Sequence, residues 1–337
     1  MISAGANRPD FNIETQINTQ TLVALHQGRP LPEAGEEAAA NLAARGFVNI
    51  EARGPRAAVL VVGLDDGARW FQVSQRATSA ATQIIRRHAS EIRNAINGIE
   101  GLSRLPWQNV SFFVLSDVLL DSWQINAVEQ RWLGVERPQR SGGRYYYSVM
   151  ARPANSEIEA FSIHGNQFFN YGDVAVGLYG NRRLSGARLP TLDASQLQAL
   201  FGIETNEPQT VHAELARSLA VAARGSALPS SLLAGFQTLG LASGAGQVIV
   251  PVLHESEYFA LNNVAGLIAP DLVALLEEER SSLRGVYASS RYVEEVSFEE
   301  YLIWWYHFFY TAVTNRLARG GDLDLPPNGT MTYVVTE

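Results

Sequence analysis

The chain of 337 residues contains no cysteine. This absence excludes disulfides, thiolate nucleophiles, iron–sulfur clusters and cysteine-rich zinc sites. It also agrees with a cytoplasmic protein, because disulfides accumulate in oxidising compartments. Charged residues are sparse, at 18%, and the formal net charge is −8. A general nucleic-acid binder needs a dense positive surface that displaces phosphate counterions, so we expect no nucleic-acid partner.

Long apolar runs are also missing. The aromatic block at residues 302–310 is short and is interrupted by His307, whereas crossing a bilayer takes roughly 20 apolar residues. The N-terminus lacks the charged-then-apolar pattern of a signal peptide. We therefore expect a soluble cytoplasmic protein without a membrane partner.

The signatures of common enzyme classes are missing too. The chain has no G-x-x-x-x-G-K-[ST] loop, no G-x-G-x-x-G after a strand and no G-x-S-x-G. An ordinary nucleotide-dependent enzyme or serine hydrolase is therefore not expected, and no cofactor is predicted.

The remaining patterns predict an α+β protein with more than one domain, because the chain is too long for one ordinary core. Residues 1–68 are expected to form a winged-helix-like domain. Residues 69–190 are expected to form a central α+β domain with an antiparallel sheet, and residues 191–337 a mainly helical domain.

The N-terminal segment predicts helix, turn, helix and hairpin. The first helix covers residues 19–27, the second runs from Pro32 to Gly46, and the hairpin surrounds Gly54-Pro55. This is the outline of a winged helix. It is compatible with a structural domain, a DNA reader or a peptide-docking domain. The second helix has three Glu and only Arg45 as a cation, which disfavours DNA.

The same segment resembles the peptide-recognition element of ribosomal-peptide natural-product enzymes. It is also similar to the small peptide chaperone of pyrroloquinoline quinone synthesis. The residues at comparable spacings are Leu22, Leu25, Gly28, Glu36, Leu42 and Phe47. A looser similarity to crocagin-type accessory proteins accompanies this one. The resemblance implies that a leader peptide adds as a strand to a sheet edge.

The central region predicts a long helix over residues 69–100, then a buried strand that passes into a helix or turn within the apolar run 111–120. Arg86 and Arg87 are interpreted either as a solvated face or as a carboxylate clamp. On a helix, Asp117 and Asp121 share one face, which suits capping, ion pairing or acid–base work.

The stretch from Tyr145 is expected to form antiparallel strands whose Gly165-Asn166 and Gly180-Asn181 dipeptides are hairpin corners. Its aromatic face would bind a peptide at little entropic cost. That face consists of Tyr145, Tyr146, Tyr147, Phe168, Phe169 and Tyr171.

The C-terminal region predicts helices at residues 194–201, 208–224, 229–240, 266–285 and 298–319, followed by a strand. It also contains an incomplete H-E-x-x-H zinc motif. His254 and Glu255 occupy its first two positions, but Tyr258 replaces the second His. His254, Glu257 and His307 are weak candidates for metal ligands, and His254, Glu255 and His307 for catalytic residues.

Our first hypothesis is a peptide-binding accessory protein of natural-product biosynthesis. It would hold a ribosomal precursor peptide, by its leader, for modification or cyclisation, alone or in a homo- or hetero-oligomer. The alternatives are a metal-dependent or degenerate zinc-peptidase-like enzyme, which would need a divalent metal, and a winged-helix transcription regulator. The predicted peptide-binding residues are Phe47, Asn49, Arg86, Arg87, Tyr145, Tyr146, Tyr147 and Trp305.

Overall fold

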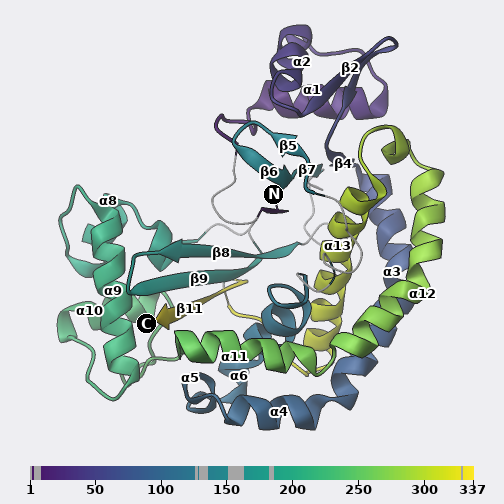
Figure 1. The fold of residues 1–337 in the computed structure, drawn as a ribbon. Helices are drawn as coiled ribbons and strands as arrows, with labels where there is room; N and C mark the ends of the chain where they lie inside the picture. The colour runs from purple at the N-terminus through teal and green to yellow at the C-terminus, as the bar shows by residue number, and fades with distance from the viewer. Residues whose placement is uncertain are drawn as a thin grey trace. The chain divides into compact units, whose positions relative to one another are not determined.

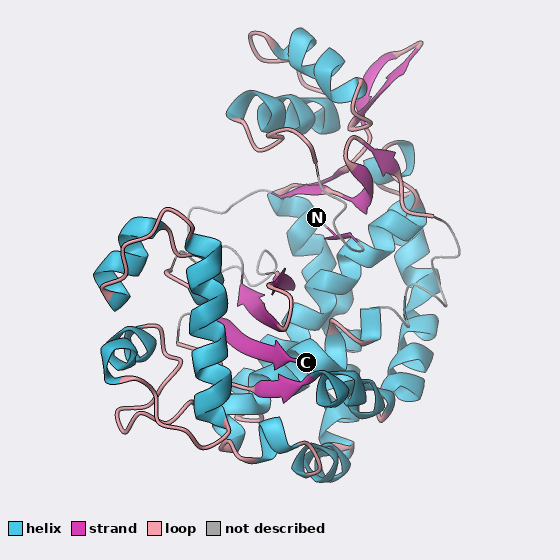
Figure 2. Cartoon of the chain, turned by 60° about the vertical axis from the view of Figure 1, so that its left-hand side comes forward, coloured by secondary structure: helices cyan, strands magenta, loops and turns pink. Residues whose placement is uncertain are grey.

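The structure, a computed structural model, describes residues 2–3, 9–125, 128, 136–150, 163–181, 186–327 and 329–337. Helices and small sheets alternate in an α+β fold, as predicted (Figure 2). Two compact units draw on segments that are distant in sequence. Unit 1 consists of Met1–Thr78, Ala127–Phe161 and Val273–Ala312, and unit 2 of Ser79–Asn126, Ser162–Leu272 and Val313–Glu337. The division at residues 68 and 190 stays a prediction.

Unit 1 begins with two helices and a hairpin, in the predicted order. α1 (Gln16–Gln27) starts at Thr15, whose side chain accepts a hydrogen bond from the Asn18 backbone N–H, and ends at Gly28. α2 spans Gly35–Ala43. β2 (Val48–Glu51) and β3 (Gly54–Ala57) then pair antiparallel. Assignment of this segment to the winged-helix class stays a prediction.

Two further small sheets belong to unit 1. β4 (Leu60–Val62) pairs in parallel with β7 (Ser148–Met150). β6 (Gly143–Tyr146) lies between β1 (Ile2–Ser3) and β5 (Gln139–Arg140). The antiparallel partner predicted for β7 falls mostly in residues 151–162, outside the described residues. Among the described residues, β7 pairs instead with the parallel strand β4. Strands that are distant in sequence compete for the same edge, and short-range sequence patterns cannot predict which of them pairs.

The core of unit 1 is aromatic and encloses a buried ion pair between Arg140 and Glu300. Phe47 packs on Tyr147 and Tyr145, with ring centroids 5.5 and 6.3 Å away. Arg140 forms an ion pair with Glu300, N to O 3.2 Å, and both side chains are buried. Glu300 lies in the first turn of α13 (Phe298–Arg319), whose bounds agree with the prediction.

Unit 2 contains a four-stranded sheet in the order β10–β11–β9–β8 (Figure 1). β8 (His164–Asn170), β9 (Val174–Asn181) and β11 (Thr330–Thr336) are antiparallel neighbours, and β10 (Val252–His254) is parallel to β11. The predicted Gly-Asn corners are wrong, because Gly165 lies opposite Gly180 within the ladder. A Cβ on Gly180 would lie 2.2 Å from the Gly329 carbonyl oxygen, so close strand approach explains this glycine.

Helices cover this sheet. α8 (Ala194–Phe201), α9 (Pro208–Ala223) and α10 (Ser230–Thr238) follow the predicted ranges closely. Asp193 caps α8 with a reciprocal capping box. A buried apolar cluster joins these helices to Val174, Val176 and Val334 of the sheet. The chain continues after β10 as α11 (Glu255–Gly266) and α12 (Ala269–Ala288).

The region predicted as one long helix and a buried strand forms a series of helices separated by short breaks. Its elements are α3 (Leu64–Arg87), α4 (Ala89–Asn97), α5 (Glu100–Ser103), α6 (Trp107–Phe112) and the π-helix η1 (Phe113–Val118). The strand predicted to open the run 111–120 is wrong, because residues 111–118 are helical from the start of the run. A fully buried apolar run lacks the polar positions that distinguish strand from helix periodicity.

Within the described residues, no single helix combines the length and apolar composition needed to cross a bilayer. One bent pair, Glu255–Gly266 with Ala269–Ala288, meets the criterion only when its two helices are joined.

Candidate functional site

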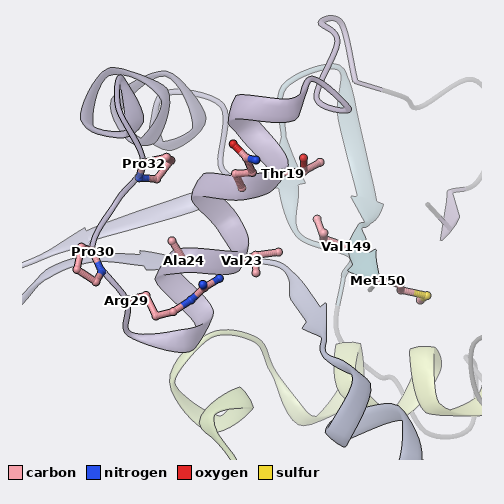
Figure 3. A pocket seen from close by; sticks show the side chains of 9 residues that line it. Thr19, Val23, Ala24, Arg29, Pro30, Pro32, Val149 and Met150 are labelled. Atoms are coloured by element: carbon pink, nitrogen blue, oxygen red, sulfur yellow. The ribbon is translucent and has the colours of Figure 1, made fainter. Parts of the chain in front are cut away.

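A cavity of about 570 Å³ lies against α1 in unit 1 (Figure 3). We call it cavity A. Its lining comes from α1, from the loop that follows α1 and from the end of β7. The lining residues are Thr19, Gln20, Val23, Ala24, Arg29, Pro30, Pro32, Val149 and Met150. The surface is therefore apolar with a few polar side chains, which is typical of a binding pocket.

A second cavity of unit 1, about 720 Å³, adjoins the first at Val23. We call it cavity B. Val61, Val62 and Gly63 line it where β4 ends. Val61 and Val62 lie opposite Val149 and Met150 in the strand register, so both cavities meet the carboxyl ends of the same two parallel strands. We call cavities A and B together the α1 groove.

Two glycines shape the groove. Gly28 ends α1 with a φ of 62°, a conformation that disfavours side chains, and turns the chain toward Pro30 and Pro32. A Cβ at Gly28 would lie 2.8 Å from Arg291 Nη1. Gly63 joins β4 to α3, and its N–H donates to Asp66 Oδ2 at 3.2 Å. These backbone positions bring the end of α1, the start of α3 and Arg291 to one cavity.

A charged cluster borders cavity B. His26 is only 7% exposed; its Nδ1 donates to Glu295 Oε2 at 2.8 Å, and its Nε2 lies 3.6 Å from Asp66 Oδ2. Burial opposes the charge on His26, but the two carboxylates outweigh burial and raise its pKa to about 9. Tyr292 stacks on His26 with a centroid distance of 5.4 Å and donates to the Val61 carbonyl.

The pKa values of the two carboxyl groups next to His26 shift in opposite directions. Burial raises the pKa of Glu295, although the His26 charge opposes this shift. For Asp66, burial is outweighed by His26, and the pKa is lowered. The arrangement is a buried imidazolium between two carboxylates, which holds a fixed charge pattern at the cavity wall.

Unit 2 contains a polar cluster of a different kind around η1. Asp117 is fully buried, and burial together with repulsion from Asp121 raises its pKa well above the ordinary value. Asn166 Nδ2 donates to Asp117 Oδ2 at 3.2 Å, to Ser122 Oγ at 2.9 Å and to Tyr333 OH at 2.7 Å. π-Helices often occur at functional sites. Asp117 and Asp121 do interact, as their predicted shared face implied.

The predicted aromatic peptide-binding residues lie mostly in the core of unit 1. Phe47 and Tyr145 are fully buried, as the core packing requires, and Tyr146 and Tyr147 are nearly so. Trp305 is buried and donates its Nε1–H to Ser74 Oγ at 2.9 Å. The exposed Asn49 lies on β2. The sheet face predicted to combine Tyr145 with Phe168 is wrong, because β6 and β8 belong to different sheets.

Arg86 and Arg87 form surface ion pairs within unit 2. Arg86 Nη2 lies 2.8 Å from Asp322 Oδ2, and Arg87 Nη2 lies 3.0 Å from Asp271 Oδ2. Their guanidinium groups therefore contact carboxylates of the chain itself.

The incomplete zinc motif lies at a helix start. His254 is the N-cap of α11, and Glu257 accepts hydrogen bonds from the His254 and Gly101 backbone N–H groups. His307 is buried in unit 1 and donates Nδ1–H to the Ile303 carbonyl, while burial lowers its pKa to about 4. The described residues include no group of three His, Cys, Asp or Glu placed to hold a metal. Glu255 opens α11.

Sequence reasoning missed His26, Asp66, Tyr292 and Glu295. The contact between His26 and Glu295 joins residues 269 positions apart, which no local pattern reveals. The sequence signal that could have identified His26 was its position in the last turn of a short predicted helix that ends in glycine.

Comparison with known proteins adds no relative: no family model, curated protein or solved structure matches this chain.

Proposed function

We propose that the protein is a cytoplasmic peptide-binding accessory protein that holds a ribosomal precursor peptide for modification or cyclisation. The observation that carries the proposal is the α1 groove, part of whose lining comes from the segment whose sequence resembles leader-peptide recognition elements. The groove is formed by a helix beside a short strand, and such a surface suits an extended chain.

The dimensions fit several residues of extended peptide. Thr19, Val23 and Gln27 lie four residues apart, on one face of α1. Eight residues of helix cover about 12 Å, which equals roughly four residues of extended chain. The cavity volumes, about 570 and 720 Å³, fall in the range typical of ligand sites.

Strand β7 supplies backbone partners. It pairs with β4 along one edge, and among the described residues no strand pairs with its other edge. An incoming strand gains affinity from main-chain hydrogen bonds at such an edge and selectivity from neighbouring pockets. Cavity A provides that pocket, since Val149 and Met150 line it opposite α1.

The test is selection from a displayed library of random twelve-residue peptides. Enriched peptides are synthesised with a fluorophore, and their affinities are measured by fluorescence polarisation. Thr19→Trp places a large ring in cavity A, and we expect it to weaken binding at least about 10-fold. Gln16→Trp, on an exposed α1 residue that does not line either cavity, is the matched control.

Met150→Arg gives an independent change on the strand side of cavity A. Circular dichroism and thermal unfolding establish that each variant is folded. The proposal fails when the library yields no enriched peptide, or when the selected peptides bind Thr19→Trp and Met150→Arg as tightly as the unchanged protein. The metal-enzyme and transcription-regulator alternatives stay predictions, tested by metal analysis and by salt-dependent DNA retention.

A further inference from the structure

We propose that the α1 groove selects an acidic peptide, one of whose carboxylates binds between Arg69 and Arg291 in cavity B. This inference rests on the proposed peptide function and specifies the chemistry of the partner. It starts from three arginines that form no direct ion pair in the described part of the chain, although the charge of Arg291 also acts on Glu295.

Three arginines line the groove, Arg29 in cavity A and Arg69 and Arg291 in cavity B. Within the described residues, none of the three forms an ion pair with a carboxylate, and Arg291 donates to the His26 carbonyl at 3.3 Å. Elsewhere, Arg86, Arg87 and similar surface arginines pair with acidic side chains. The groove therefore offers guanidinium groups that a ligand can bind.

The acidic groups near these arginines are largely occupied by other partners. Asp66 accepts a hydrogen bond from the Gly63 N–H and faces His26, and Glu295 accepts a hydrogen bond from His26 Nδ1–H. Asp65 lies exposed at the start of α3. Among the described residues that line the groove, the cations are Arg29, Arg69, Arg291 and protonated His26, and the carboxylates are Asp65 and Asp66. Glu295, which contacts His26, adds one negative charge next to this lining. The surface is thus slightly positive in a chain of formal net charge −8.

The type of cation favours a carboxylate ligand. The chain contains no lysine, so all 26 of its basic side chains are arginine. A guanidinium group presents a planar fork of N–H donors that matches a carboxylate in bidentate geometry. Arg291 enters the groove over Gly28, where a Cβ would lie 2.8 Å from its Nη1. Because Gly28 has no side chain, the Arg291 guanidinium group can occupy this position.

The position of cavity B relative to cavity A predicts how the apolar and acidic residues are spaced along the peptide. Cavity A accepts apolar side chains beside β7, and cavity B begins at Val23, on the same helix. An extended chain that fills cavity A reaches cavity B within a few residues, since each residue advances about 3.3 Å. We expect the acidic residue to follow or precede an apolar one by two to four positions.

The experiment uses the same displayed library and measures the amino-acid composition of the enriched peptides as well as their enrichment. Selected peptides should contain more Asp and Glu than the starting library. Arg69→Gln and Arg291→Gln should each weaken the best peptide about 10-fold. Arg53→Gln is the control, because Arg53 is exposed in the β2–β3 turn and does not line either cavity.

Two arms identify the source of the carboxylate. Replacing each Glu or Asp of the peptide by Gln or Asn tests the side chains, and amidating the peptide tests its C-terminus. Loss of affinity in either arm, together with loss in Arg69→Gln, supports the proposal. The chain has no cysteine, so one cysteine introduced at the exposed Gln27 can carry a fluorophore that reports occupation of cavity B directly.

Some results would separate this inference from the proposed function. Peptides that depend on Thr19 but show no acidic enrichment, and that bind Arg69→Gln and Arg291→Gln normally, overturn carboxylate recognition and leave peptide binding intact. A library without any enriched peptide overturns both. Because Arg69 is exposed, its variant is expected to fold even where Arg291→Gln does not.

Discussion

Two buried polar clusters, one in each unit, stabilise opposite charge states of their central side chains, charged in one and neutral in the other. In unit 1, His26 carries a charge that two carboxylates stabilise at a cavity wall. In unit 2, Asp117 is surrounded by Ser122, Asn166 and the neighbouring carboxyl of Asp121, and its protonated form is favoured. A buried charge persists where a counter-charge is present, and otherwise the group shifts its pKa toward the neutral form.

This difference separates a surface prepared for ligands from a polar interior. The His26 cluster keeps its charges next to solvent-filled space, where they can act on a bound molecule. In the Asp117 cluster the Asn166 Nδ2 group binds the Asp117 carboxyl and the Tyr333 hydroxyl, so these contacts stay within the cluster. Substitutions in each cluster, and the pH dependence of stability, test whether the contrast between charged and neutral clusters holds.

The largest effect is expected from His26→Gln. Removing the imidazolium leaves Glu295 and Asp66 as neighbouring carboxylates without their shared counter-charge. Breaking a buried pair in this way costs about 3–5 kcal/mol. Denaturant unfolding measures the change. His88→Gln is the control, because the partly exposed ion pairs of His88 with Glu91 and Asp271 should be worth less than about 1 kcal/mol. Equal effects of the two changes would contradict the comparison.

The pH dependence of unit 1 gives the next effect. The folded pKa of His26, about 9, exceeds the ordinary 6.5, so the folded state holds a proton that the unfolded state loses between these values. The stabilisation is complete below pH 6.5 and disappears as pH rises through 9. The unfolding free energy should fall by up to about 1.4 kcal/mol per pH unit in this window.

The matched measurement compares the unchanged protein with His26→Gln from pH 7 to pH 10. The variant should lack the His26 contribution, so the difference between the two proteins should shrink as pH rises. A constant difference across this range would show that His26 is not charged in the folded protein.

The helices of this fold were predictable where local signals are strong. Asp193 with Gln196 marks the start of α8, and Phe298–Arg319 combines a capping serine with a terminal glycine pair. The region around Asp117 was not predictable, because a buried helix and a buried strand share the same apolar composition. The pairing of Gly165 with Gly180 also escaped prediction, since Gly-Asn is turn chemistry unless another strand, here β11, requires close backbone approach.

The candidate site was predictable only as a segment. The resemblance directed attention to residues 22–47, and α1, which lines both cavities, begins just before this range. The residues predicted to bind the peptide are not the ones that line the cavities, because aromatic side chains such as Tyr145 belong to the core of unit 1. Arg291 and Glu295 reach the groove from nearly 270 residues away, and one sequence contains no signal for such contacts.

A smaller effect on the free energy of unfolding is expected from a substitution at Asp117. A carboxyl with a raised folded pKa keeps its proton while the unfolded chain releases it, so this group lowers stability as pH rises above about 4. Asp117→Asn removes the titration and retains a similar shape. We expect the variant to gain about 1 kcal/mol relative to the unchanged protein at pH 7, and less at pH 4.

Thermal unfolding at the two pH values measures this gain. Asp271→Asn, at an exposed carboxylate whose pKa His88 and Arg87 lower, is the control and should shift stability in the opposite direction. A loss of stability at pH 7 larger than at pH 4 in Asp117→Asn would mean that Asp117 is ionised in the folded protein.

The smallest effects concern one tyrosine hydroxyl in each cluster. Tyr292→Phe removes a 2.9 Å hydrogen bond to the buried Val61 carbonyl, which has no other side-chain donor among the described contacts. Tyr333→Phe removes one acceptor from Asn166 Nδ2, which still donates to Asp117 and Ser122. Because an unmade buried hydrogen bond costs more than the loss of one among several, we expect about 1–2 kcal/mol for Tyr292→Phe and less than about 1 kcal/mol for Tyr333→Phe. Denaturant unfolding at pH 7 ranks the two. The reverse ranking would show that the neutral cluster depends on each of its contacts, whereas the charged cluster is held by its ions alone.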